Sequence, residues 1–294
     1  MAWLQLEIML DAGEVERIET TLTAAGAISV TCCDAADTPL YEPDALHPPL
    51  WPHTRLSALF PSNVDRDALR AVLAAALRKL PPHRFTPLAD RDWEREWLRD
   101  FQPMRFGRRL WIVPSAYAPP DPAAVNVRLD PGLAFGTGTH PTTALCLEWL
   151  DAAALAGKTV VDYGCGSGIL AIAAVRLGAM QVHAVDNDPQ ALAATRDNAG
   201  RNHVEAQTEI GPPESLPAAP VDVVIANILA TPLVELAAQF AAHLKPGGQL
   251  VLSGILSDQD REMRAAYSPW FRFGSGAQRE GWLRLDAHRK PESH

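Results

Sequence analysis

The feature that most constrains this chain is a glycine-rich run that directly follows an apolar segment. Residues 160–168 read Val-Val-Asp-Tyr-Gly-Cys-Gly-Ser-Gly, and a second apolar run ends in Asp186. Glycines at every second position let a loop approach a ligand closely, and a carboxylate after the next strand can accept hydrogen bonds from a ribose diol. The pattern therefore predicts an α/β domain that binds a nucleoside.

Strand and helix patterns alternate from about residue 130 onward. We expect strands at 159–162, 182–186, 206–210, 221–227 and 249–255, and helices at 168–177, 189–200, 232–244 and 258–266. Nearly continuous apolar strands are typical of a parallel sheet that is covered on both faces. With an antiparallel hairpin at 270–289, the segment predicts a doubly wound, mostly parallel sheet whose binding site lies at the carboxyl ends of the strands.

The amino-terminal segment has a different pattern. We expect strands at 4–10, 27–33, 56–60 and around 85, and helices at 15–22 and 69–77. Gly26 is placed to end the first helix, and Ser62 or Asn63 to cap the second. The resulting order, βαββαβ, is that of a small ferredoxin-like α+β domain.

A charged stretch connects these two patterns. Residues 90–100 predict a helix in which Trp93 and Trp97 lie on one face. Three arginines follow, which we interpret as a solvated basic turn, with substrate contact as the alternative: Arg105, Arg108 and Arg109. We therefore divide the chain into an amino-terminal domain (1–88), an interdomain helix and linker (89–128) and a nucleoside-binding domain (129–294).

The amino-acid composition limits the kinds of partner that we expect for this protein. The net charge is −9, so DNA is not an expected partner. The four cysteines lack metal-site spacing, which predicts reduced thiols and no metal. The first residues show no basic leader and an early Glu7, and no uncharged apolar run is long enough to span a membrane. We expect a cytoplasmic protein without a membrane partner, and a monomer.

Two classes of nucleoside fit the glycine run. Gly166-Ser-Gly168-Ile-Leu-Ala matches the degenerate GxGxxA form of dinucleotide sites, with Asp186 at a compatible spacing. However, Asp162 stands two residues before the first glycine, where it would repel a pyrophosphate but could hold an ammonium group. No Tyr-x-x-x-Lys pair for carbonyl reduction is present. These features favour a cationic amino-acid nucleoside over a nicotinamide cofactor.

At this point a family resemblance can be stated. Asp162-x-Gly164-x-Gly166-x-Gly168 with Asp186 resembles the S-adenosylmethionine (AdoMet) site of class I methyltransferases. Asn227-Ile-Leu-Ala stands where methyltransferases acting on planar nitrogen carry Asn/Asp-Pro-Pro-aromatic. The missing aromatic residue argues against methylation of a nucleobase.

Longer segments resemble one family more closely. Residues 129–143 and 92–107 resemble the signature segment and interdomain helix of bacterial ribosomal protein L-eleven methyltransferases (PrmA). The resemblance implies a class I methyltransferase domain behind an amino-terminal domain that recognises the ribosomal protein. It also implies AdoMet contacts at the following residues, with Asn227 as the candidate catalytic residue: Thr143, Asp162, Gly164, Gly166, Gly168, Asp186 and Asn227.

Some of these residues have simpler interpretations. Thr143 is, on spacing alone, equally a helix-start residue, because Pro141 suits a first helical turn. Asp188 is interpreted as a helix cap rather than a ligand. His140 is interpreted as a structural turn residue, with contact near the methyl acceptor as the alternative.

The resemblance implies methylation of lysine side chains and of the amino-terminal α-amine of the L-eleven protein. We expect the amine to lose its proton to solvent, to a backbone group or to Asn227, because no residue stands out as a general base. The two-domain layout and Gly107 suggest that the small domain pivots to present several amines in turn. The alternatives are methylation of another protein or a small amine, a NAD-dependent oxidoreductase, and a non-catalytic AdoMet-binding module.

Overall fold

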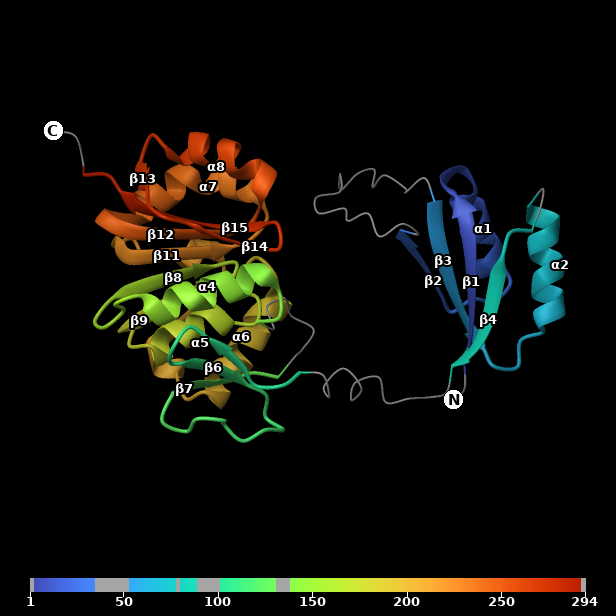
Figure 1. Ribbon diagram of the computed structural model, residues 1–294, viewed down its shortest axis with the longest axis horizontal. Helices are drawn as coiled ribbons and strands as arrows, with labels where there is room; N and C mark the ends of the chain where they lie inside the picture. Colours follow the sequence, from blue (N-terminus) through green and yellow to red (C-terminus); the bar gives the residue numbers. More distant parts are fainter. Residues whose placement is uncertain (1–2, 35–52, 78–79, 89–100, 131–137, 292–294) are drawn as a thin grey trace. The chain divides into compact units, whose positions relative to one another are not determined.

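The computed structural model describes residues 3–34, 53–77, 80–88, 101–130 and 138–291, which fall into two compact units, Met1–Glu96 and Trp97–His294 (Figure 1). The expected helix at 90–100, with Trp93 and Trp97, lies outside the described residues, as do residues 131–137 of the signature segment.

The first unit is a four-stranded antiparallel sheet with two helices. Its elements are β1 (Trp3–Asp11), α1 (Ala12–Ala24), β2 (Ser29–Asp34), β3 (His53–Pro61), α2 (Arg66–Ala76) and β4 (His83–Leu88). The strand order is β2-β3-β1-β4. Alternate residues of β1 pack with both helices in one buried cluster, so α1 and α2 cover the same face of the sheet. The ferredoxin-like prediction is therefore confirmed.

The predicted cap of α2 is wrong. Asp65 caps this helix, and one of its carboxylate oxygens accepts from the N–H groups two and three residues ahead, at 2.9 and 3.2 Å. Ser62 and Asn63 lie within a turn that the N–H of Val64 closes by donating to the carbonyl of Pro61 (3.1 Å). They therefore precede the helix by too many residues to reach its free N–H groups.

The second unit contains a sheet of eight strands. These are β8 (Thr159–Tyr163), β9 (Gln181–Val185), β10 (Thr208–Gly211), β11 (Val221–Asn227), β12 (Leu244–Leu256), β13 (Phe271–Phe273), β14 (Ala277–Arg279) and β15 (Trp282–Arg289). The order is β10-β9-β8-β11-β12-β15-β13, with β14 paired to β15. Strands β8 to β12 are parallel to one another. Strand β15 is antiparallel to β12, and β13 and β14 are antiparallel to β15. The doubly wound fold and its carboxyl-terminal antiparallel segment are confirmed.

Helices cover both faces of this sheet (Figure 1). On one face lie α4 (Pro141–Ala152), α5 (Ile169–Arg176) and α6 (Pro189–Arg201); on the other lie α7 (Ala230–His243) and α8 (Asp260–Tyr267). The chain leaves β8 toward β9 in one direction and crosses to β11 in the other. The carboxyl ends of β8 and β11 therefore flank a topological switch point, where sheets of this kind bind ligands.

A small sheet precedes α4 and was not predicted. It consists of β5 (Met104–Phe106), β6 (Leu110–Val113) and β7 (Val125–Arg128), in that order. Its apolar side chains are buried with those of α4 and α5 in one core. Residues 101–128, which the sequence suggested to be a linker, thus pack as part of the second unit.

The proposed pivot at Gly107 is wrong. Gly107 turns the chain between β5 and β6 with φ +67°, and a side chain there would collide with the carboxylate of Asp151. That carboxylate accepts from the backbone N–H groups of Arg108 (2.6 Å) and Arg109 (3.0 Å). Because these bonds fix the turn on the end of α4, Gly107 cannot act as a hinge.

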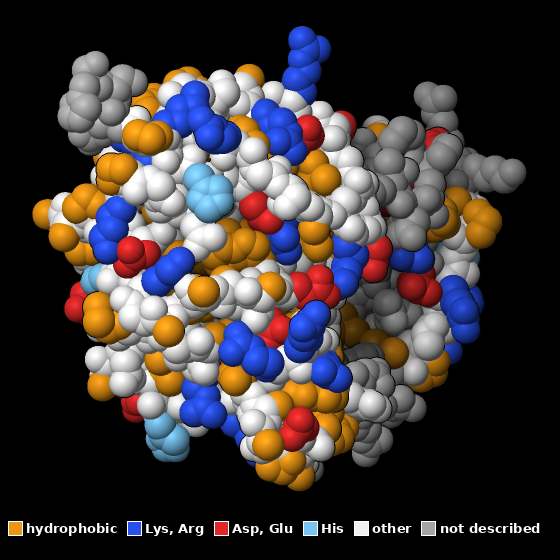
Figure 2. Space-filling view, turned by 60° about the vertical axis from the view of Figure 1, so that its left-hand side comes forward, with side chains coloured by type: hydrophobic (Ala, Val, Ile, Leu, Met, Phe, Trp, Pro, Cys, Tyr) orange, Lys and Arg blue, Asp and Glu red, His pale blue; other side chains and the backbone are white. Residues whose placement is uncertain are grey.

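The surface of the protein carries charges of both signs. Figure 2 shows Lys and Arg side chains interspersed with Asp and Glu on one face. Among the helices that the structure describes, none is both long and apolar enough to cross a membrane.

Candidate active site

The glycine loop lies at the carboxyl end of β8. Gly164, Gly166 and Gly168 have φ values of +77°, +54° and +78°, a region that other L-residues rarely adopt. The N–H of Gly164 donates to the carbonyl of Val185 at the end of β9 (2.8 Å), and Gly168 is the N-cap of α5. The loop is therefore held against two strand ends, with the amino end of a helix directly behind it.

Asp186 follows β9 and lies beside this loop. One carboxylate oxygen accepts from the N–H of Gly166 and the other from the N–H of Asp188, both at 2.9 Å. The side chain is partly exposed, so it can still accept from a ligand hydroxyl. Asp188 itself caps α6 by accepting from the N–H of Gln190 (2.8 Å), which confirms its interpretation as a cap.

Asp162 is a fully buried carboxylate beneath the loop. Its Oδ2 accepts from the N–H of Ala171 (2.9 Å), whereas its Oδ1 has no hydrogen-bond partner among the described residues. Burial, aided by the nearby charge of Asp186, raises the pKa of this carboxyl to about 7, although the bond from Ala171 acts to lower it. An ammonium group at Oδ1 would supply both the missing hydrogen bond and the missing counter-charge.

Asn227 and Thr143 come together at the end of β11. The amide nitrogen of Asn227 donates to Oγ1 of Thr143 (3.2 Å), and Thr143 is buried in the first turn of α4. A neighbouring bond from Ser253 of β12 to the carbonyl of Thr142 (3.3 Å) ties the same turn to the sheet. Three elements that are distant in sequence thus fix the orientation of the Asn227 amide.

Ile228, directly after β11, is closely approached by the glycine loop and by β12. A side chain at Gly164 would collide with the Ile228 side chain, and one at Gly254 would collide with the Ile228 carbonyl. Gly254 has φ +85° and lies at an irregularity in the pairing of β12. An isolated glycine inside a strand is a signal for such a close approach, although we did not use it.

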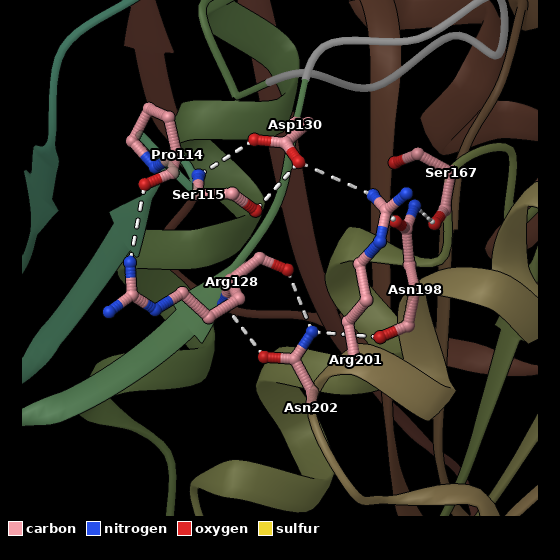
Figure 3. Close-up of polar contacts among 8 residues, drawn as sticks. All are labelled: Pro114, Ser115, Arg128, Asp130, Ser167, Asn198, Arg201 and Asn202. Atoms are coloured by element: carbon pink, nitrogen blue, oxygen red, sulfur yellow. Dashed lines mark hydrogen bonds and ion pairs between the residues drawn. The ribbon is translucent and has the colours of Figure 1, made fainter. Parts of the chain in front are cut away.

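A polar network that runs from buried Asn198 out to exposed Arg201 and Ser115 supports the glycine loop from behind (Figure 3). Asn198 of α6 donates to the carbonyl of Ser167 (2.9 Å) and accepts from Arg201 (3.2 Å). Arg201 pairs with Asp130 (3.5 Å), which accepts from the backbone N–H and hydroxyl of Ser115, both at 2.7 Å. The loop is therefore connected through α6 to the segment that follows β7.

A second branch of this network closes on the same helix (Figure 3). Arg128 and Asn202 exchange two bonds, from the Arg128 N–H to the Asn202 amide oxygen and from the Asn202 amide nitrogen to the Arg128 carbonyl, each 2.7 Å. The Arg128 guanidinium donates to the carbonyls of Pro114 (3.3 Å) and Tyr117 (2.5 Å). None of these partners has a sequence motif, because their contacts depend on the packing of α6 against the small sheet.

Comparison with known proteins identifies the family. A family model described as ribosomal protein L11 methyltransferase (PrmA) matches residues 2–290. The chain belongs to this family. The L11 methyltransferase of Pseudomonas paraeruginosa is 55% identical over 294 residues, which cover 99% of this chain and 100% of that protein. The one from Azotobacter vinelandii is 54% identical over 293 residues, with the same coverage.

A solved structure agrees with this assignment. The ribosomal protein L11 methylase of Lactobacillus delbrueckii subsp. bulgaricus has a TM-score of 0.58 and 34% identity, and covers 65% of this chain and 100% of that one. The resemblance to the L11 methyltransferase family is therefore confirmed, and the dehydrogenase alternative is wrong. Family membership makes the chain a methyltransferase and identifies AdoMet as its cofactor.

Proposed function

We propose that this protein transfers methyl groups from AdoMet to amines of ribosomal protein L11, at lysine side chains and at the amino-terminal α-amine. The supporting observation is that a match to the L11 methyltransferase family over residues 2–290 coincides with an ordered site at the switch point of the sheet. Relatives that carry this name align with nearly the whole chain.

The residues at the carboxyl edge fit AdoMet. Gly164, Gly166 and Gly168 allow the backbone to lie close to the methionine end, and Asp186 accepts from the ribose hydroxyls. The unpartnered oxygen of Asp162 suits the methionine ammonium group, and Thr143 lies beside Asn227 at the same edge. When bound, AdoMet supplies a methyl group that is already activated by the positive charge on sulfur.

Asn227 orients the acceptor amine. Because its amide nitrogen donates to Thr143, its amide oxygen remains to accept from an amine N–H. Positioning of two reactants in this way can contribute on the order of 7–11 kcal/mol to catalysis. The amine reacts in its neutral form, and a lysine with an ordinary pKa of about 10.4 needs more help in losing its proton than an α-amine at about 7.7–8.0.

We assign no general base to this site. His140 is the N-cap residue of α4, three residues before Thr143, but its Nδ1 lies 2.7 Å from the hydroxyl of Thr142 and accepts from the backbone N–H of Thr142 at 3.4 Å. This contact caps the helix and keeps the ring in a structural role. The proton therefore leaves to solvent, a backbone group or the Asn227 amide oxygen.

The remaining assignments concern partners and location. The first unit recognises the ribosomal protein, as the family resemblance implies, and the protein acts as a monomer in the cytoplasm. A net charge of −9 argues against DNA as a partner. The interspersed charges in Figure 2 are in keeping with this.

Label transfer tests the proposed substrate. The protein is incubated with AdoMet labelled in its methyl group and with ribosomal proteins from cells that lack L11 methylation. We expect label in L11 above all other ribosomal proteins, and about a hundredfold slower labelling with Asn227→Ala. Label in a different protein, or only in an added small amine, would overturn the substrate assignment.

A further inference from the structure

The described segment that directly follows β11 carries no aromatic side chain. Asn227 is followed by Ile228, Leu229 and Ala230, and Leu229 is 47% exposed. An exposed leucine offers apolar contact but no attraction for a cation. An amine arrives mostly as an ammonium ion at neutral pH, so a site for it gains from an aromatic face or a carboxylate.

The hairpin of β14 and β15 brings an aromatic ring to this edge. Trp282 pairs with Leu256 at the carboxyl end of β12, and Ser253 of the same strand is the register partner of Asn227. The Trp282 ring lies edge-to-face with His140, with centroids 5.0 Å apart and an interplanar angle of 69°. His140 caps the helix whose Thr143 holds Asn227, so the ring and the amide belong to one continuous wall.

The tip of this hairpin is held rigidly. The N–H and hydroxyl of Ser257 both donate to the carbonyl of Gly281, at 2.9 and 2.8 Å. On the other side, Arg279 pairs with Glu148 of α4 at 2.7 Å. Between these anchors Glu280 (φ +50°) and Gly281 (φ +82°) form the two-residue turn of the hairpin, a turn in which positive φ at both positions suits the twist of the strands.

The charges at the tip suit a cation. Glu280 is exposed, and its carboxylate only partly offsets the fall in the His140 pKa that burial causes. Because burial is the larger effect, the pKa of His140 lies below its ordinary value, which favours a neutral ring that does not repel an ammonium group. Arg279, which precedes Glu280 in the chain, is paired with Glu148 (2.7 Å), and Glu280 has no ion pair among the residues that the structure describes.

We propose that Trp282, Glu280 and His140 form an acceptor subsite that binds the protonated amine of the substrate, a lysine side chain above all, before it reaches Asn227. This inference rests on the proposed function. Trp282 supplies the aromatic face that the Asn227–Ala230 segment lacks, Glu280 supplies the attracting charge, and His140 is a positioning residue that holds the ring. The ammonium group then loses its proton to solvent on passing to the Asn227 amide.

The test measures kcat and KM for undermethylated L11, together with AdoMet affinity, in four variants. Trp282→Ala should raise KM roughly tenfold through loss of a cation–π contact, and Glu280→Gln should raise it severalfold through loss of an attracting charge. In both variants AdoMet affinity should change less than about twofold. Trp282→Phe should restore most of the loss. Glu262→Gln removes one exposed carboxylate from α8 of the same unit and should leave KM unchanged.

The outcomes separate the two proposals. No methyl transfer to L11 by the wild-type protein would overturn both. Transfer with an unchanged KM in Trp282→Ala and Glu280→Gln would overturn the acceptor subsite alone, as would a loss that appears in AdoMet affinity instead. If Trp282→Ala unfolds, Glu280→Gln still decides, because it alters only an exposed side chain.

Discussion

Replacement of Asp162 by asparagine should make the protein more stable at pH 7 and above, and its cofactor site weaker. The Asp162 pKa rises from 3.8 to about 7 on folding, because burial opposes the charge. Each pKa unit corresponds to about 1.36 kcal/mol. The free energy of unfolding should therefore fall by about 4 kcal/mol between pH 4 and pH 7, compared with a protein in which this pKa did not change on folding.

The direction of this pH dependence of stability follows from proton binding. The folded protein keeps the Asp162 proton to a higher pH than the unfolded chain, so the contribution to stability is complete below pH 3.8 and is lost as pH rises through 7. Asparagine does not ionise. Its amide nitrogen, in the place of the unpartnered oxygen, costs about 1–3 kcal/mol, but that cost is the same at every pH.

Urea unfolding between pH 5 and 8 isolates this effect. The free energy of unfolding of Asp162→Asn minus that of the wild type should rise by about 2 kcal/mol from pH 5 to pH 7 and then level off. Asp197→Asn, an exposed change on α6, should show no such trend. A flat difference for Asp162→Asn would refute the reasoning about its burial.

Cofactor affinity should move in the opposite direction. Loss of a charge-assisted bond to the methionine ammonium group should weaken AdoMet binding about tenfold to a hundredfold at pH 8, measured by calorimetry. In the wild type the affinity should fall as pH drops below 7, where Asp162 takes up a proton. Equal affinity in the variant and the wild type would show that Asp162 does not contact the cofactor.

Three further changes test other parts of the site. Asn227→Ala should lower kcat for L11 by about a hundredfold with a smaller effect on AdoMet affinity, as expected for lost positioning; an unchanged kcat would contradict its role. Gly164→Ala should destabilise the protein by at least about 1–2 kcal/mol in thermal unfolding, because its φ is +77° and the added side chain collides with Ile228. The double variant Gly164→Ala with Ile228→Ala removes the collision but not the backbone strain, so it should recover only part of this loss. Asn198→Ala leaves the Ser167 carbonyl without its donor and should cost about 1–3 kcal/mol of stability and also weaken AdoMet binding; normal binding would mean that the network does not hold the loop.

The parts of the fold that could be predicted are those in which one strong local pattern decides. The apolar runs of the parallel strands are buried on both faces, so they stand out from the amphipathic helices between them. The glycine loop was predictable because Gly164, Gly166 and Gly168 all adopt positive φ. Asp188 also followed local rules, since a cap bonds to N–H groups only two residues away.

The parts that could not be predicted depend on contacts between distant residues. The strands β5 to β7 have three or four residues each, too few for a clear period, and form because α4 and α5 bury their apolar side chains. The contact between Trp282 and His140 requires the reversal of β15 against β12, which no local spacing reveals. The bond between Asn198 and Ser167 likewise arises only once α6 packs behind the loop.

The central claim is most directly tested by mass spectrometry of ribosomal protein L11. The protein is incubated with AdoMet and L11 from cells that lack its methylation, and the modified positions are mapped by fragmentation. We predict methyl groups on lysine side chains and on the amino-terminal α-amine, and about a hundredfold slower appearance of them with Asn227→Ala. L11 that keeps its unmodified mass, while the same preparation binds AdoMet, would contradict the proposed function.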